Sequence, residues 1–309
     1  MDASVVICTR NRAASLARTL ESLTAMARPA GWAWEVVVVD NASTDATADV
    51  LAQFADRLPL VAVAEARRGL SNARNRGVAA ARGRYLLWTD DDVLVDPGWL
   101  AAYADAARRW PEAALFGGRV VPVLEAPAAA WFAASTAELA HLLAARDFGP
   151  DPRPLGEGCK PFGANYAVRA AEQRRHPYDP ALGAGAGHRG RMGEETAVID
   201  AVLEAGGSGV YVPAATVRHL IGRERQTFAH VLACYRAHGE TAAHIERARR
   251  ARLPGGVPPW LLRRIVESAA GFVLARLTAP PPVYVRALKR LGYALGYAGH
   301  LRAQAAGRP

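Results

Sequence analysis

Apolar runs typical of strands alternate with helical stripes of apolar residues along the first 120 positions of the chain. Residues 35–40 are apolar almost throughout, which is typical of a strand covered on both faces. Leu16, Leu20 and Leu23 instead recur at the spacing of one helix face. The pattern predicts strands over residues 4–8, 35–40, 60–64 and 84–89, and helices over residues 13–26, 71–81 and 97–110, with another that opens at Ser43 or Thr44.

This alternation of strands and helices predicts an α/β fold, with a mostly parallel, Rossmann-like sheet and helices on both faces. Ligands of such folds bind at the carboxyl ends of the strands. Polar residues follow the predicted strands at these ends: residues 9–12 after the first, Asp40 after the second, and three consecutive aspartates, residues 90–92, after the fourth. We therefore expect the functional site along this edge of the sheet.

The middle of the chain is less regular. Residues 122–161 are rich in alanine and proline and predict one helix, over residues 133–146. Glycines and prolines without periodicity predict a mobile loop over residues 180–193. A helix over residues 194–204 and a strand over residues 209–213 follow.

Composition and charge limit the class of protein. The 309 residues are 51% hydrophobic, enough for a buried core, and the three separate cysteines predict neither a disulfide framework nor a zinc site. The net charge of +9 is uneven: residues 1–212 hold 22 basic and 25 acidic side chains, whereas residues 213–309 hold 16 and 4. Because nucleic-acid enzymes usually carry positive charge around the catalytic cleft, we expect no nucleic-acid partner.

The basic C-terminal part has a helical pattern. Its clearest apolar stripe comprises Trp260, Leu261, Ile265, Ala269, Phe272 and Val273, interleaved with Arg263, Arg264 and Arg276. This stripe predicts either a helix packed on the rest of the protein or peripheral contact with an anionic membrane. The sequence shows no signal-peptide pattern and no uninterrupted apolar segment of the roughly 18 to 20 residues that a membrane span needs. The expected location is cytoplasmic, with the inner face of the membrane as the alternative.

The three aspartates are the sharpest chemical feature. Successive side chains of a strand point to opposite faces, so Asp90 and Asp92 are expected on one side. Adjacent carboxylates repel one another unless a cation lies among them, and a hard divalent ion that also binds phosphate oxygens is the natural partner. The alternative is a solvated acidic turn before the next helix.

Glu194 and Glu195 open a predicted helix directly after the glycine-rich segment. Adjacent helical residues project about 100° apart, so one of the two is expected to face the site squarely. The helix N-terminus favours the ionised form of a carboxyl group, which suits a general base. Acidic residues are also common in first helical turns for capping alone, so both interpretations stay open.

Six motifs, in order, resemble those of the family 2 inverting glycosyltransferases of the GT-A fold. They are residues 4–12 (SVVICTRNR), 36–45 (VVVVDNASTD), 69–77 (GLSNARNRG), 88–93 (WTDDDV), 163–169 (GANYAVR) and 193–196 (GEET). The resemblance spans roughly residues 3–222. It implies a catalytic domain over residues 1–222, with a nucleotide-binding half over about 1–121 and an acceptor half over about 122–222. A basic helical region over residues 223–309 follows, for which the resemblance implies packing on the acceptor side or a homodimer contact.

The resemblance also implies roles for single residues. Nucleotide contacts fall on Thr9, Arg10, Asp40, Arg74, Asp90 and Asp91, with Asp40 on the base, usually uracil. Asp90 and Asp92 match the DxD motif, which holds the ribose and a Mg²⁺ or Mn²⁺ ion that bridges the diphosphate; Asp92 is the expected metal ligand, with His219 near the metal. Glu195 matches the catalytic base, for which the family more often has Asp, and Glu194 keeps the choice between the two open. The donor sugar and the acceptor would be bordered by Gly163, Ala164, Asn165 and Tyr166, and Arg223 and Arg225 are candidates to reach the diphosphate.

The implied activity is inverting transfer of a sugar from a nucleotide-diphosphate donor, usually a UDP-sugar, to the hydroxyl of a glycan, a lipid-linked glycan or a small natural product. A nucleotidyltransferase and a dinucleotide-dependent oxidoreductase are both disfavoured, because no glycine-rich phosphate loop follows the first strand. The other alternative is a catalytically inactive protein that binds sugar nucleotides or acts as a scaffold.

Overall fold

The computed structural model describes residues 1–185, 191–249 and 257–306, which form two compact units. The first unit comprises Met1–Val123, Ala144–Ala186 and Glu194–Leu220. The second comprises Leu124–Leu143, Gly187–Gly193 and Ile221–Pro309. Residues 124–143, which the sequence assigns to the acceptor half, therefore group with the C-terminal helices.

The first unit contains a mixed sheet with helices, as the alternating pattern predicts. Its strands are β1 (Ala3–Thr9), β2 (Trp34–Asp40), β3 (Leu60–Ala64), β4 (Tyr85–Asp90), β5 (Val93–Val95), β6 (Leu115–Leu124), β7 (Arg153–Pro154), β8 (Asn165–Arg169) and β9 (Gly209–Ile221). Its helices are α1 (Ala13–Thr24), α2 (Thr47–Phe54), α3 (Leu70–Ala80), α4 (Trp99–Arg109), α6 (Ala170–Arg175) and α7 (Glu194–Glu204). Both β6 and β9 continue by one residue into the second unit.

The strand order brings the predicted polar ends together. Along the sheet the order is β3-β2-β1-β4-β8-β6-β9-β5, with β7 paired to β9. The first four strands are parallel, whereas β8 pairs antiparallel with both β4 and β6, and β5 pairs antiparallel with β9. Thr9 lies opposite Asp40, and Cys8 lies opposite Asp90. The carboxyl ends of β2, β1 and β4 therefore meet along one edge.

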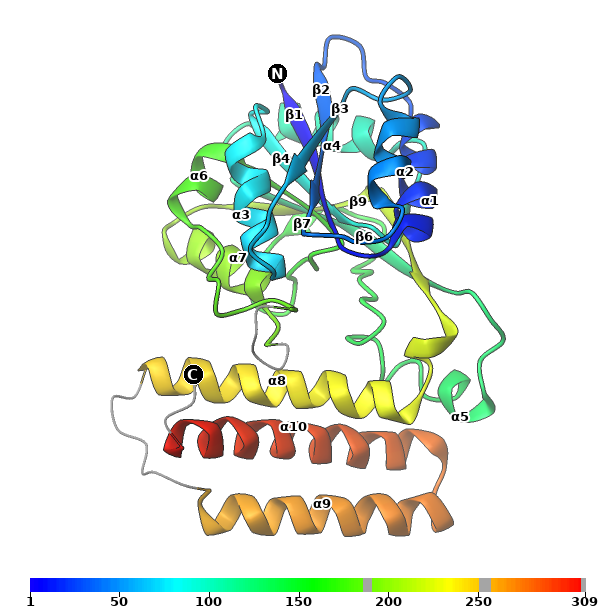
Figure 1. The fold of residues 1–309 in the computed structure, drawn as a ribbon, viewed down its shortest axis with the longest axis vertical. Coiled ribbons are helices and arrows are strands. Elements are labelled where there is room, and N and C mark those ends of the chain that lie inside the picture. Colours follow the sequence, from blue (N-terminus) through cyan, green and yellow to red (C-terminus); the bar gives the residue numbers. More distant parts are fainter. Residues whose placement is uncertain (186–190, 250–256, 307–309) are drawn as a thin grey trace. The chain divides into compact units, whose positions relative to one another are not determined.

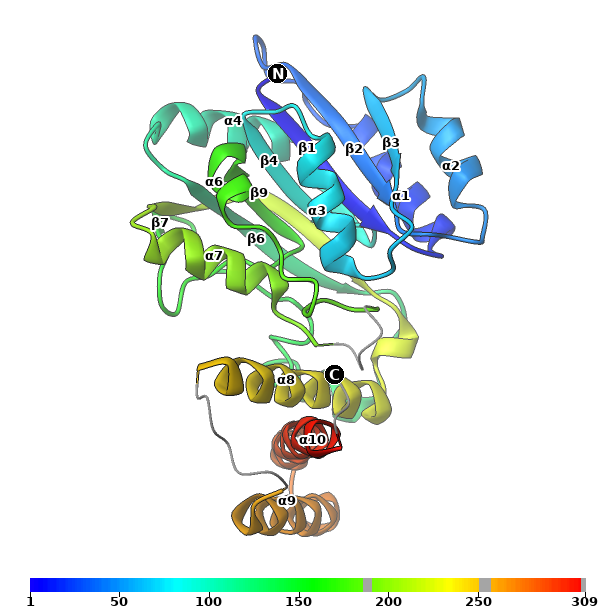
Figure 2. The same cartoon turned by 60° about the vertical axis from the view of Figure 1, so that its left-hand side comes forward.

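Alternate residues of the central strands fill two separate cores. Val5 and Ile7 of β1 belong to the core that includes residues of α1, α2 and α4, whereas Val6 belongs to the core that includes residues of α3 and α7. Figure 1 shows α1 and α2 on one side of the parallel strands and α3 on the other, and Figure 2 shows the same arrangement. Burial on both faces explains why β2 is apolar almost throughout.

Three secondary-structure predictions were wrong in their bounds or type. Residues 134–144 form successive turns instead of the predicted helix over residues 133–146. Ser135 Oγ donates to the carbonyl of Trp131, a bond that competes with regular helix continuation. The last strand continues to Ile221 instead of ending at residue 213. The helix expected to open at Ser43 or Thr44 is α2, which begins at Thr47, where Asp45 accepts a hydrogen bond from the backbone N–H of Thr47. Part of the predicted mobile loop, residues 186–190, lies outside the described residues.

The second unit is helical. It contains α5 (Ala130–Ala133), the 3-10 helix η1 (Arg223–Arg225), α8 (Phe228–Arg249), α9 (Pro259–Thr278) and α10 (Pro281–Ala305). Within this unit α10 lies between α8 and α9 (Figures 1 and 2). Gly239 of α8 and Gly296 of α10 permit close approach, because a Cβ atom at either position would clash with the backbone of the other helix. Among the described helices, none has the length and apolar character required to cross a bilayer.

Candidate active site

The edge formed by β1 and β2 presents polar groups from two strand ends. Thr9, at the end of β1, is buried, and its Oγ1 donates to Asp91 Oδ2 at 2.7 Å. Asp40, at the end of β2, accepts from the backbone N–H of Ser43 at 2.9 Å. Arg10 Nε is buried and has no hydrogen-bond partner among the described residues. An unsatisfied cationic donor at this edge suits an anionic ligand.

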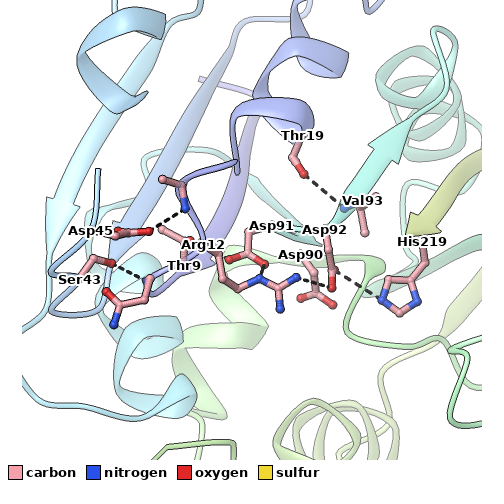
Figure 3. Close-up of polar contacts among 12 residues, drawn as sticks. Thr9, Arg12, Thr19, Ser43, Asp45, Asp90, Asp91, Asp92, Val93 and His219 are labelled. Atoms are coloured by element: carbon pink, nitrogen blue, oxygen red, sulfur yellow. Dashed lines mark hydrogen bonds and ion pairs between the residues drawn. The ribbon is translucent and has the colours of Figure 1, made fainter. Parts of the chain in front are cut away.

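The three aspartates do not continue one strand. β4 ends at Asp90, and Asp91 and Asp92 form a turn before β5, so the expected strand alternation of Asp90 and Asp92 is wrong. Asp90 keeps 38% of its side chain exposed, with Oδ1 3.8 Å from Arg74. Asp91 and Asp92 are buried, and both contact Arg12 (Figure 3). The turn thus divides the carboxylates between two different arginines.

Arg12 is a site residue to which the sequence analysis assigned no role. Its Nε lies 3.0 Å from Asp91 Oδ1, and its Nη2 lies 2.8 Å from Asp92 Oδ2. The one sequence feature that could have indicated a role for Arg12 is its position in the polar segment that follows β1, directly before α1. Its distance to the aspartates depends on the turn after β4, which the linear pattern does not reveal.

The buried position of Asp91 disfavours its ionised form. Burial raises the pKa of Asp91 to about 7, although Arg12 and the Thr9 hydroxyl oppose the rise, and the neighbouring charges of Asp92 and Asp90 add to it. An additional cation beside these residues would stabilise their ionised forms.

His219 and Asp92 provide a partial ligand set for such a cation. His219 lies opposite Val93 in the β9–β5 pair, and its Nε2 is 3.5 Å from Asp92 Oδ1 (Figure 3). The described residues contain no group of three or more His, Cys, Asp or Glu side chains arranged to hold a metal. Ions such as Mg²⁺ bind through one or two carboxylates and complete their shell with phosphate and water. Asp92 and His219, with Asp90 nearby, therefore fit an ion shared with a diphosphate better than an ion held by protein alone.

Arg74 of α3 links the aspartates to the glutamates of α7. It is 4% exposed, and its Nη1 lies 3.3 Å from Glu194 Oε1 and 4.0 Å from Glu195 Oε2. The guanidinium also lies over the ring of Tyr178, at 5.4 Å from the ring centre. One buried cation therefore faces carboxylates from β4 and from the start of α7.

The structure distinguishes the two adjacent glutamates. Glu194 is buried, with 6% of its side chain exposed, and burial together with the charge of Glu195 raises its pKa to about 7 against the opposing effect of Arg74. Glu195 exposes 15% of its side chain. Because a general base must reach the substrate hydroxyl, Glu195 is the better placed of the two.

The segment expected to border the sugars is largely buried. Asn165 Oδ1 accepts from Trp99 and Tyr103, and its Nδ2 donates to the carbonyls of Arg119 and Ala215. These four bonds use all the hydrogen-bonding capacity of the side-chain amide. The expected contact of Asn165 with a sugar is therefore corrected: the side chain has a structural role. Ala164 and Tyr166 are also buried, and the Tyr166 hydroxyl hydrogen-bonds Tyr178.

Gly163 has a packing role beside the site. A Cβ atom at this position would lie 2.7 Å from Arg74 Nη2, so the glycine leaves room for the arginine. Arg223 and Arg225 form η1 in the second unit, and their contact with a diphosphate stays a prediction.

Part of the chain is similar to a known protein family and to known enzymes. Residues 4–130 match the family described as Glycosyl transferase family 2. The validoxylamine A glucosyltransferase of Streptomyces hygroscopicus subsp. jinggangensis is 43% identical over 110 residues, which cover 34% of this chain and 26% of that enzyme. The chain spans less than half the length of the curated relatives that it matches.

Two solved structures resemble the whole chain. Staphylococcus aureus TarS 1–349, in complex with UDP, has a TM-score of 0.56 at 15% identity over 100% of this chain and 92% of that chain. The mannosyltransferase PcManGT of Pyrobaculum calidifontis, in complex with GDP-Man and Mn²⁺, has a TM-score of 0.57 at 20% identity, over 99% of this chain and 75% of that chain. These likenesses confirm the expected GT-A fold.

Proposed function

We propose that the chain is a metal-dependent, inverting glycosyltransferase, and the match of residues 4–130 to the family described as Glycosyl transferase family 2 supports this proposal. The donor would be a nucleotide-diphosphate sugar, with UDP as the first nucleotide to test, and the acceptor would provide a hydroxyl group. The observation that carries the proposal is the meeting of Thr9, Asp40 and Asp90 at adjacent strand ends, beside the carboxylates gathered around Arg74.

Different residues of the chain would bind the donor and activate the acceptor. Asp40 and the unsatisfied Arg10 Nε would bind the nucleotide, and Asp92 with His219 would hold Mg²⁺ or Mn²⁺. When bound, the ion would neutralise negative charge on the leaving diphosphate. Glu195 would accept the proton from the acceptor hydroxyl as that oxygen attacks the anomeric carbon, and a single displacement inverts the configuration. Arg74 would keep the glutamates oriented through its contacts of 3.3 and 4.0 Å.

Replacement of Asp92 by Asn tests the metal part of the proposal. We expect Asp92→Asn to weaken Mn²⁺-dependent UDP binding by about tenfold or more, because it removes a charged oxygen ligand beside His219. Calorimetric titration with UDP, in Mn²⁺ and in EDTA, provides the measurement, and UDP binding in EDTA should be little changed.

The matched control is Asp96→Asn, which removes an equivalent charge from a carboxylate paired with Arg218. This control should leave the effect of Mn²⁺ on UDP affinity intact. Equal UDP affinity of the wild-type protein in Mn²⁺ and in EDTA would contradict the proposed metal site.

A further inference from the structure

Exposed apolar side chains are concentrated on one helix of the second unit. Of the twelve large hydrophobic residues that are exposed in the described part of the chain, six lie on α9. They are Trp260 (56% exposed), Leu262 (43%), Val266 (66%), Val273 (60%), Leu274 (64%) and Leu277 (80%). Contiguous apolar patches of this kind on soluble proteins mark interaction sites.

Four of these residues form a continuous face, which we call the α9 stripe: Leu262, Val266, Val273 and Leu277. Their spacings of four, seven and four residues place them on one side of a helix. Leu261 is buried on a different side of α9, and Ile265 and Phe272 pack against buried clusters of the second unit. Packing among the described residues therefore leaves the α9 stripe exposed, and part of the apolar stripe predicted from the sequence, including Val273, faces outward.

The charge of the C-terminal region favours an anionic surface as the partner of the stripe. Residues 213–309 hold 16 basic and 4 acidic side chains. Arg263 follows Leu262 directly at the edge of the stripe, with 82% of its side chain exposed, and forms an ion pair of 2.6 Å with Glu267. Arg264 is also exposed, but its position in the helix turns it away from the stripe. A second copy of the chain would bring like charges together around the stripe, whereas an anionic bilayer accepts the apolar side chains and attracts the arginines.

We propose that the α9 stripe binds peripherally to an anionic membrane surface. α9 would lie in the plane of the interface, with Val266 and Leu277 inserted among the acyl chains and Arg263 near the headgroups. This proposal rests on the second unit alone and does not depend on the proposed sugar transfer.

Vesicle flotation of the full chain tests the proposal. At low salt the wild-type protein should float with vesicles of mixed phosphatidylglycerol and phosphatidylcholine, and it should float much less with phosphatidylcholine alone or at high salt. Val266→Glu and Leu277→Glu should each weaken the partition coefficient about tenfold or more, since each removes an apolar group that would insert into the bilayer and adds a negative charge. Arg263→Gln, at the edge of the stripe, should weaken it about fivefold.

Val121→Glu is the matched control, because Val121 is also exposed, at 38%, but lies on β6 of the first unit. It should leave flotation unchanged, and circular dichroism should show every variant folded. Absence of flotation at low salt, or equal flotation of the α9 variants and the wild-type protein, would overturn the proposal. A concentration-dependent dimer that Val266→Glu dissociates would overturn it in favour of a second copy.

Discussion

Glu195→Gln is expected to lower the rate of sugar transfer about 10²- to 10⁴-fold, because the amide cannot accept the proton of the acceptor hydroxyl. The substitution preserves the size of the side chain and leaves the strand ends of β1, β2 and β4 untouched. UDP binding, measured by calorimetry in the presence of Mn²⁺, should therefore stay close to that of the wild-type protein. Steady-state transfer, or donor hydrolysis where the acceptor is not yet identified, gives the rate.

Two further substitutions make this result specific. Glu204→Gln, at the exposed end of α7, is the matched control and should retain full activity. Glu194→Gln should reduce transfer less than Glu195→Gln does, because Glu194 is buried against Arg74 and acts only by orienting its neighbours. Wild-type turnover in Glu195→Gln, or complete loss in Glu194→Gln alone, would place the base elsewhere.

Arg74→Met is expected to lower the free energy of unfolding by about 3 to 5 kcal/mol, the usual cost of removing one partner from a buried charge cluster. Asp90, Glu194 and Glu195 would then face one another without their common cation. Urea unfolding followed by circular dichroism gives the free energy. Arg76→Met, at an exposed position of the same helix, is the matched control and should change stability little.

The loss of stability in Arg74→Met should be larger at high pH than at low pH. Burial raises the pKa of Glu194 to about 7 even with Arg74 present, and removal of this cation raises it further. Below this pKa the folded protein holds Glu194 protonated, so less charge repulsion remains to destabilise Arg74→Met. The difference in stability between the variant and the wild-type protein should therefore shrink as pH falls from 8 toward 5. A difference that is small at every pH would contradict the role of Arg74 as the common cation.

The parallel half of the fold was predictable because the apolar pattern of each segment agrees with the place that the segment takes in the sheet. β1, β2, β3 and β4 are short apolar runs separated by amphipathic helices, so the strand-end rule correctly brought Thr9, Asp40 and Asp90 to one edge. The antiparallel strands β6 and β8 were missed, because their burial depends on partners far along the chain. The predicted helix over residues 133–146 failed for a related reason, since its apolar residues, such as Leu139, are held by tertiary packing in the second unit.

The candidate site was predictable in its residue types but not in its connections. The motifs identified the aspartates and the glutamates. They did not reveal that Arg12 holds Asp91 and Asp92, or that Arg74 contacts carboxylates that follow it by up to 121 positions in the chain. Such pairings arise from the turn after β4 and from the hydrophobic core that α3 and α7 share, which periodicity does not encode. The sequence also could not reveal that the side chain of Asn165 makes all its hydrogen bonds within the protein, because its partners come from other elements of the fold.

The bond that the protein breaks in a sugar nucleotide tests the central claim most directly. Wild-type protein with Mn²⁺ would be incubated with UDP- and GDP-sugars, with pyrophosphate present as a competing reactant, and the nucleotide products would be separated by anion-exchange chromatography. We expect slow release of the nucleoside diphosphate and the free sugar, with water as acceptor, and we expect EDTA to stop this release. Formation of a nucleoside triphosphate and a sugar 1-phosphate would instead identify a nucleotidyltransferase, and binding of the donors without any product would identify an inactive sugar-nucleotide-binding protein.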